Sequence, residues 1–124
     1  MRLWHESIIT QLPRQQLLGQ HRECCALRGN GWGRKQSTID YVFKYSPYFL
    51  YRYHLLVMNE MKKRGYSVTE GWLNKNYCGQ YCQSYTNMSE SNIPTPIYNE
   101  HNEKYLKDCI ENLKSKGIEI IYSV

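Results

Sequence analysis

The chain has 124 residues and a formal net charge of +5, and this length fits a single domain. It contains no run of the roughly 18 apolar residues that a membrane span requires. Its first ten residues include an acid and a histidine, where a signal peptide is apolar. We therefore expect one domain over residues 1–124, located in the cytoplasm, without a membrane partner. The oligomeric state stays open, a monomer being our expectation.

Basic residues are concentrated in the first half of the chain. Residues 1–64 hold eleven Lys or Arg against four Asp or Glu, whereas residues 65–124 hold five against seven. A polyanion would therefore contact the N-terminal half. Nucleic acid fits this asymmetry, and an ordinary solvated surface is the other interpretation.

The cysteine pattern does not indicate a disulfide framework. The count is odd, at five, and Cys24 and Cys25 are neighbours within a predicted helix. We expect all five thiols to be free, as in a reducing compartment. Four histidines accompany them, but neither a CxxC nor an HExxH motif occurs, so we expect no metal site.

A first helix is predicted over residues 11–28, because Thr10 can cap it, Pro13 suits its first turn and the run Gly29-Asn30-Gly31 can end it in a left-handed conformation. Its apolar face carries Leu17, Leu18, Cys24, Cys25 and Leu27. Its polar stripe carries Gln15, Gln16, Gly19, Arg22 and Glu23. A glycine in this stripe allows close approach to the backbone, which suits a helix crossing and a bound ligand equally.

A loop and a second helix follow. Residues 29–45 are predicted to be a loop in which Arg34 and Lys35 are interspersed with aromatic residues, a composition suited to phosphate contacts. The second helix is predicted over residues 47–64, beginning at Pro47 and closed by Gly65. Its buried line includes His54, which we interpret as a core histidine with its hydrogen bonds satisfied.

The rest of the chain is less regular. Residues 66–98 hold tyrosines and cysteines at near-helical spacing, so a short helix around positions 77–85 is one interpretation. A third helix is predicted over residues 100–116 and ends at Gly117. The last seven residues are β-prone without an obvious partner strand, and we expect them to lie extended against the helices. The sequence thus predicts an all-α fold, a compact bundle of three main helices with extended N- and C-terminal segments.

Two groups of residues on the first helix are candidates for chemistry. Arg22 and Glu23 suit general acid–base work beside an anion, the alternative being a solvated ion pair. Cys24 or Cys25 is a possible nucleophile, although core filling is the commoner role of such thiols.

Two stretches of the sequence resemble a known family. MRLWHESIITQLPRQQLLGQHRE and SPYFLYRYHLLVMNEMKKRGY are similar, in order and spacing, to the pyrimidine dimer DNA glycosylases of the endonuclease V type. The resemblance covers about residues 1–66, with a weaker similarity in KGIEIIYSV near the C-terminus. It implies three helices with the N-terminus threaded between them.

The resemblance also implies an activity. Members of this family use the α-amine of their N-terminal residue to displace a damaged base through a Schiff base, and β-elimination then nicks the strand, with help from a glutamate. Here that places the catalytic roles at Met1 and Glu23, with no cofactor. The expected partner is duplex DNA with a damaged or abasic site. The expected DNA contacts are Arg2, Gln15, Gln16, Arg22, Arg28, Arg34 and Lys35.

Two departures from the family accompany this interpretation. Met1 precedes a large residue, Arg2, so methionine is expected to be retained and to supply the amine. Ala26 stands where the family has a second basic residue, and Arg28 can replace it only from the next turn. A non-catalytic nucleic-acid or partner-binding module with the same fold is the alternative function.

Overall fold

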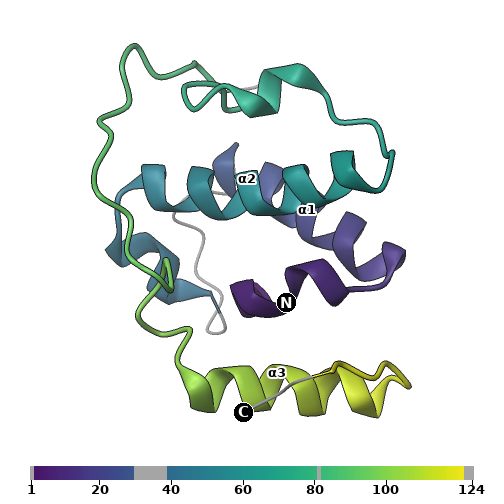
Figure 1. Cartoon of the computed structure of the whole chain (residues 1–124). Coiled ribbons are helices and arrows are strands. Elements are labelled where there is room, and N and C mark those ends of the chain that lie inside the picture. Colours follow the sequence, from purple (N-terminus) through teal and green to yellow (C-terminus); the bar gives the residue numbers. More distant parts are fainter. Residues whose placement is uncertain (1, 30–38, 81, 122–124) are drawn as a thin grey trace.

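The structure is a computed structural model that describes residues 2–29, 39–80 and 82–121. Within these residues it is helical and contains no strand, which confirms the all-α prediction. Three α-helices, α1 (Arg14–Arg28), α2 (Pro47–Lys63) and α3 (Glu103–Ser115), alternate with three 3-10 helices. These are η1 (Glu6–Gln11), η2 (Asp40–Lys44) and η3 (Glu70–Leu73). In Figure 1, α1 and α2 pack together, and the N-terminal segment lies between this pair and α3.

Helix α1 begins three residues later than the sequence predicts. Thr10 belongs to η1, and Leu12 is extended. Proline disfavours the helical conformation of the residue before it, so Pro13 separates η1 from α1 and becomes the N-cap residue. Gly29 ends the helix with φ of −90°, outside the left-handed region that we expected. A Cβ at Gly29 would lie 3.0 Å from the Cys78 carbonyl oxygen, so a close approach of the chain requires this glycine.

Helices α2 and α3 follow their predicted limits closely. Gly65 and Gly117 have φ of +83° and +80°, so each end turns through the left-handed conformation that glycine allows. Ser46 makes no side-chain cap to α2, whereas the Asn102 side chain accepts the Tyr105 N–H at the start of α3. The buried residues of α2 are Tyr48, Leu50, Tyr53, His54, Val57, Met58 and Met61. Four of them, Leu50, Tyr53, Val57 and Met61, belong to the hydrophobic core together with residues of α1 and of the N-terminal segment, so the core lies between these elements.

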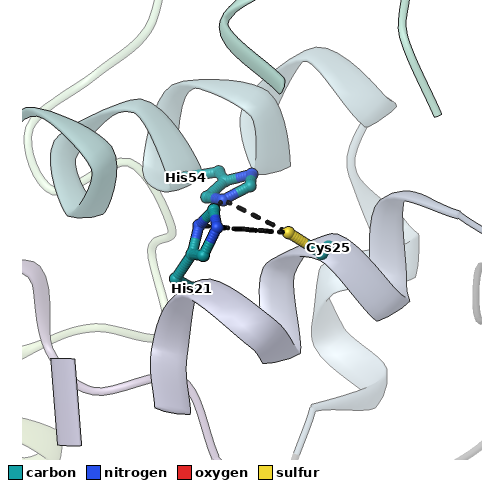
Figure 2. Close-up of side chains that lie close together, drawn as sticks. All are labelled: His21, Cys25 and His54. Atoms are coloured by element: carbon teal, nitrogen blue, oxygen red, sulfur yellow. Dashed lines mark hydrogen bonds between the residues drawn. The ribbon is translucent and has the colours of Figure 1, made fainter. Parts of the chain in front are cut away.

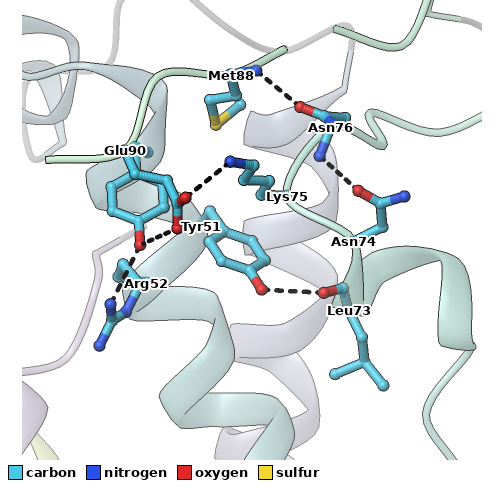
Figure 3. A network of polar contacts seen from close by, with 9 residues as sticks. Tyr51, Arg52, Leu73, Asn74, Lys75, Asn76, Met88 and Glu90 are labelled. Carbon is cyan, nitrogen blue, oxygen red and sulfur yellow. Dashed lines mark hydrogen bonds and ion pairs between the residues drawn. The ribbon is translucent and has the colours of Figure 1, made fainter. Parts of the chain in front are cut away.

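The segment after η3 forms no helix in the residues described, so the predicted helix around positions 77–85 is wrong. Polar contacts hold this segment against α2 instead (Figure 3). The Tyr51 hydroxyl donates to the Leu73 carbonyl over 2.9 Å, and Lys75 forms an ion pair with Glu90 at 3.2 Å. The Met88 N–H donates to Asn76 Oδ1 over 2.8 Å. In this irregular segment, side chains rather than helical hydrogen bonds pair with the backbone groups.

The expectation of five free thiols is also corrected. Cys78 and Cys82 form a disulfide, whereas Cys24, Cys25 and Cys109 are free. Gly79 has φ of +99°, and the turn that it allows brings the two Cα atoms to 5.6 Å, a distance that a disulfide spans. Their spacing of four looks helical in the sequence, and only the folded chain shows the turn.

The C-terminal end of the described chain contacts η1. At the C-terminal end, Ile121 exchanges two hydrogen bonds with the Gln11 side chain, of 2.7 and 2.8 Å. Residues 118–121 form no strand, as expected for this part of the tail. Among the helices described, none is both long enough and apolar enough to cross a membrane.

Candidate active site

A cleft of about 600 Å³ opens between α1, the N-terminal segment and the end of α3. Its lining residues are Arg2, Trp4, Gln15, Gln16, Gly19, Gln20, Arg22, Glu23, Asn112 and Lys116. All five residues of the predicted polar stripe are among them. Residues at three- and four-residue steps share one face of a helix, so α1 presents this stripe as one wall of the cleft.

Buried hydrogen bonds hold the N-terminal segment at this wall. The Gln20 side chain donates to the Arg2 carbonyl over 2.9 Å and accepts the Trp4 N–H over 3.1 Å. The Tyr53 hydroxyl lies 2.6 Å from the Trp4 carbonyl oxygen and 2.8 Å from Gln20 Oε1. From α3, the Tyr105 hydroxyl donates to the Leu3 carbonyl over 2.6 Å. The backbone that follows Met1 is therefore fixed from both sides.

The cleft carries an excess of positive charge. Arg2 and Lys116 each place their cation over the ring of Trp4, at 5.6 and 5.3 Å from its centroid. Arg22 on α1 is exposed to solvent and adds a third cation. Three basic side chains against one carboxylate make this cleft suited to an anionic ligand.

Glu23 is the one acid among the lining residues, and it is buried. Burial raises the pKa of the Glu23 carboxyl, and the positive charge at the N-terminus of the chain acts in the opposite direction. A raised pKa brings a carboxyl closer to the pH at which it both accepts and releases protons readily. Glu23 is therefore a buried carboxyl of the cleft and not a member of a solvated ion pair.

Gly19 lies in the middle of the face of α1 that lines the cleft. A Cβ built at this position would meet only the Arg22 guanidinium, at an ordinary contact distance of 3.8 Å among the described residues. No helix crosses there, so the interpretation as a helix-crossing glycine is not supported. The glycine instead leaves the backbone of α1 open to whatever occupies the cleft.

Arg28 lies outside the cleft, and its position corrects the expected DNA contact. Its guanidinium is buried between the rings of Tyr51 and Trp72, at 5.2 and 5.1 Å. Its side chain donates to the carbonyl groups of Trp72, Asn74 and Tyr77 over 2.8–3.2 Å. It also lies 2.8 Å from Nδ1 of His54. Four of its five N–H donors thus bind groups of the protein, and Arg28 holds the segment after η3 against the helices instead of facing the cleft.

The two cysteines of α1 do not suit a nucleophilic role. Neither lines the cleft. Burial raises the pKa of Cys24 well above its usual value and that of Cys25 to about 11. The thiolate is the nucleophilic form of cysteine, so burial disfavours a catalytic role for either thiol.

Three expected site residues, Met1, Arg34 and Lys35, lie outside the residues that the structure describes. Four lining residues, Trp4, Gln20, Asn112 and Lys116, were not among the residues expected at this site. Gln20 lies four residues after Gln16 and three before Glu23, so the spacing of the stripe could have found it. Its burial against the N-terminal segment is visible only in the fold. Asn112 and Lys116 reach the cleft only because α3 packs beside that segment, and no local signal marks them.

A comparison with protein families identifies the family of this chain. The family model of the pyrimidine dimer DNA glycosylases matches residues 1–74. The chain belongs to this family. It is thus an enzyme, a DNA-repair glycosylase, and its substrate is damaged DNA.

The matched span of this glycosylase includes η1, α1, η2, α2 and η3. It contains every lining residue of the cleft except Asn112 and Lys116, which α3 contributes from outside it. Comparisons with curated proteins and with solved structures find no match.

Proposed function

We propose that this glycosylase also cleaves the strand as an AP lyase on ultraviolet-damaged or abasic duplex DNA, with the α-amine of Met1 as nucleophile and Glu23 as acid–base. The observation that carries the proposal is the shared cleft of Arg2 and Glu23. Arg2 adjoins Met1 in the chain, and Gln20 holds the Arg2 carbonyl. A nucleophile attached to this anchored backbone works from a fixed position.

An α-amine suits the reaction better than a lysine. Its ordinary pKa is about 8, whereas that of a lysine side chain is about 10.4, so a useful fraction is uncharged at neutral pH. The reaction needs neither a metal nor an organic cofactor, because the amine itself forms the covalent intermediate.

The proposed reaction passes through a covalent Schiff base between the α-amine of Met1 and the sugar. The amine nitrogen bonds to C1′ of the damaged nucleotide, the bond from C1′ to the base breaks, and the base leaves with a proton. The bond from C1′ to the ring oxygen O4′ then breaks, the second amine proton is transferred to O4′, and a Schiff base forms between the nitrogen and C1′. Removal of a C2′ proton then expels the 3′ phosphate by β-elimination, which cuts the strand. Water finally hydrolyses the Schiff base and regenerates the amine.

Glu23 serves the proton transfers of this sequence. It takes a proton from the attacking amine or from C2′ and returns it to a leaving group, for which burial in the cleft and a raised pKa are suitable. Basic and amide side chains bind the phosphates. We assign this role to Arg2, Gln15, Gln16, Arg22, Arg34, Lys35 and Lys116. Since C1′ is shielded inside a duplex, these contacts also have to hold bent DNA or an extruded base.

The first test replaces Glu23. The Glu23→Gln variant keeps the shape of the side chain but cannot transfer the proton, so strand cleavage should fall by about 10²- to 10⁴-fold. Its affinity for abasic duplex DNA in a gel-shift assay should stay within a few fold. Glu70→Gln is the matched control, because Glu70 is exposed on η3 and does not line the cleft; it should cleave at the wild-type rate.

The second test concerns the amine. Incubation with abasic or ultraviolet-irradiated duplex and borohydride should trap a covalent adduct, whose peptide is identified as the N-terminal one by mass spectrometry. Acetylating the α-amine, or adding one residue before Met1, should abolish the adduct. Tight binding without any adduct would favour the non-catalytic module, and an adduct on a lysine would replace Met1 as nucleophile.

A further inference from the structure

Three side chains that can bind a metal ion meet between α1 and α2, away from the cleft. They are His21, Cys25 and His54, and their ligand atoms all lie within 4.8 Å of one another (Figure 2). His21 and Cys25 are four residues apart, so one face of α1 presents both. His54 points to them from the facing helix α2.

We propose that His21, Cys25 and His54 form a zinc site that joins α1 to α2. Imidazole nitrogen and thiolate sulfur are the ligands that zinc takes in proteins. The three atoms leave a fourth position for water. Since zinc is bound by protein groups on two helices, its effect here is to stabilise their packing rather than to take part in the repair reaction.

The distances are close to those of a zinc site. Bonds of about 2.1 Å to nitrogen and 2.3 Å to sulfur in a tetrahedron place two nitrogens about 3.4 Å apart and a sulfur about 3.6 Å from a nitrogen. Here Cys25 Sγ lies 3.9 Å from both His21 Nδ1 and His54 Nε2. The two nitrogens are 2.8 Å apart. The sulfur is thus nearly in place, and the two rings have to separate by roughly half an ångström.

A proton occupies the position between the rings in the metal-free protein. Arg28 Nη1 lies 2.8 Å from His54 Nδ1 and can only donate, so the proton of this ring is on Nε2, which donates to His21 Nδ1. Zinc binding at His54 Nε2 moves the ring proton to Nδ1, so the imidazole stays neutral, and the proton of the Cys25 thiol leaves to solvent. Arg28 then releases His54 Nδ1 but keeps its three carbonyl partners.

The ion has a route to the site. Cys25 lies on the wall of a second cleft, of about 450 Å³, together with Ala26, Gly29 and Trp72. His21 and Cys25 are partly exposed, whereas His54 is fully buried. A zinc ion can therefore reach the sulfur from solvent and then bind His54.

The test is a titration of the chain, without an affinity tag or reductant, with zinc chloride by calorimetry. We expect one ion per chain and a rise of the thermal midpoint with zinc. Cobalt in place of zinc should give a thiolate-to-metal absorption band. Cys25→Ser and His21→Gln should each weaken binding by more than roughly 100-fold, a larger effect than the loss of a group that only supports a ligand.

Cys24→Ala is the matched control, because Cys24 adjoins Cys25 on α1 but is not in the cluster; it should bind zinc like the wild type. No binding by the wild-type chain, or binding that survives both ligand variants, would overturn the site. A cobalt complex without the thiolate band would overturn the role of Cys25. Abasic-strand cleavage is expected to persist in Cys25→Ser, so failure of this proposal is distinguishable from failure of the proposed reaction.

Discussion

At the scale of single residues, burial assigns the roles on α1. Arg22 and Glu23 are neighbours in the sequence, yet Arg22 is exposed and Glu23 is 8 % exposed. The exposed cation can bind a phosphate without losing its hydration, whereas the buried carboxyl carries a desolvation cost that the fold has to tolerate. Such a cost is common at functional sites, where activity outweighs stability.

A stability measurement should reveal this cost. Burial raises the pKa of Glu23 in the folded protein, so the folded state prefers the protonated carboxyl. The stability that this preference contributes is present below the ordinary pKa of glutamate, 4.5, and is lost as the pH rises through the raised value. Glu23→Gln should therefore be more stable than the wild type at about pH 8, by an amount that shrinks toward about pH 4. Thermal unfolding of both proteins across this range checks it, and an equal difference at all pH values would contradict it.

At the scale of elements, α1 separates three tasks around its circumference. Its polar stripe lines the cleft, His21 and Cys25 face α2, and Leu17, Cys24 and Leu27 enter the core. Pro13 and Gly29 fix where the helix begins and ends. These tasks occupy most of the helix surface, and at Gly19 an added Cβ would meet only an ordinary contact.

Gly19 provides a test of the open wall. Gly19→Ala should raise the free energy of unfolding by up to about 1 kcal/mol, since alanine is the better helix former and its Cβ would meet only ordinary contacts. DNA affinity should change little. Gly19→Leu should gain similar stability but project into the cleft and weaken binding to abasic DNA by at least roughly tenfold, about 1.4 kcal/mol. Chemical denaturation and gel shifts separate the two effects; unchanged binding by Gly19→Leu would mean that DNA does not approach this wall.

At the scale of the whole molecule, folding gathers charge that the sequence only distributes. Arg2 and Arg22 come from the basic N-terminal half, but Lys116 comes from the half with a net charge of −2 and reaches the same cleft through α3. The positive surface is thus a property of the packed helices. Association with a polyanion should depend on these three groups more than on the net charge.

The salt dependence of DNA binding measures the contribution of these cations. Each phosphate contact removed should reduce the slope of log affinity against log salt by about 0.9. Arg22→Ala and Lys116→Ala should each do so and weaken binding uniformly across DNA sequences. Lys63→Ala is the control, because Lys63 is exposed at the end of α2 and does not line the cleft. A steep slope that neither cleft variant reduces would place the phosphate contacts elsewhere.

The sequence by itself determined what depends on local interactions. Helix periodicity and the glycines at positions 65 and 117 predict α2 and α3 to within a few residues, because a helix is closed by neighbours along the chain. The polar stripe of α1 was predictable for the same reason. The order of residues near Met1 and Glu23 also carried the family, which the match over residues 1–74 confirms.

Only the tertiary structure decided what depends on contacts between distant segments. Arg28 is a basic residue on a helix, and nothing local indicates that three carbonyl groups from residues 72–77 surround it. Gln20 and Lys116 become part of the cleft through the N-terminal segment and α3, respectively. His21 and Cys25 meet His54 across a helix interface, which no spacing motif describes. Burial and the proximity of charges arise from packing, and they cause the pKa shifts. The pKa shifts and the two clefts are therefore properties of the fold and not of the residue pattern.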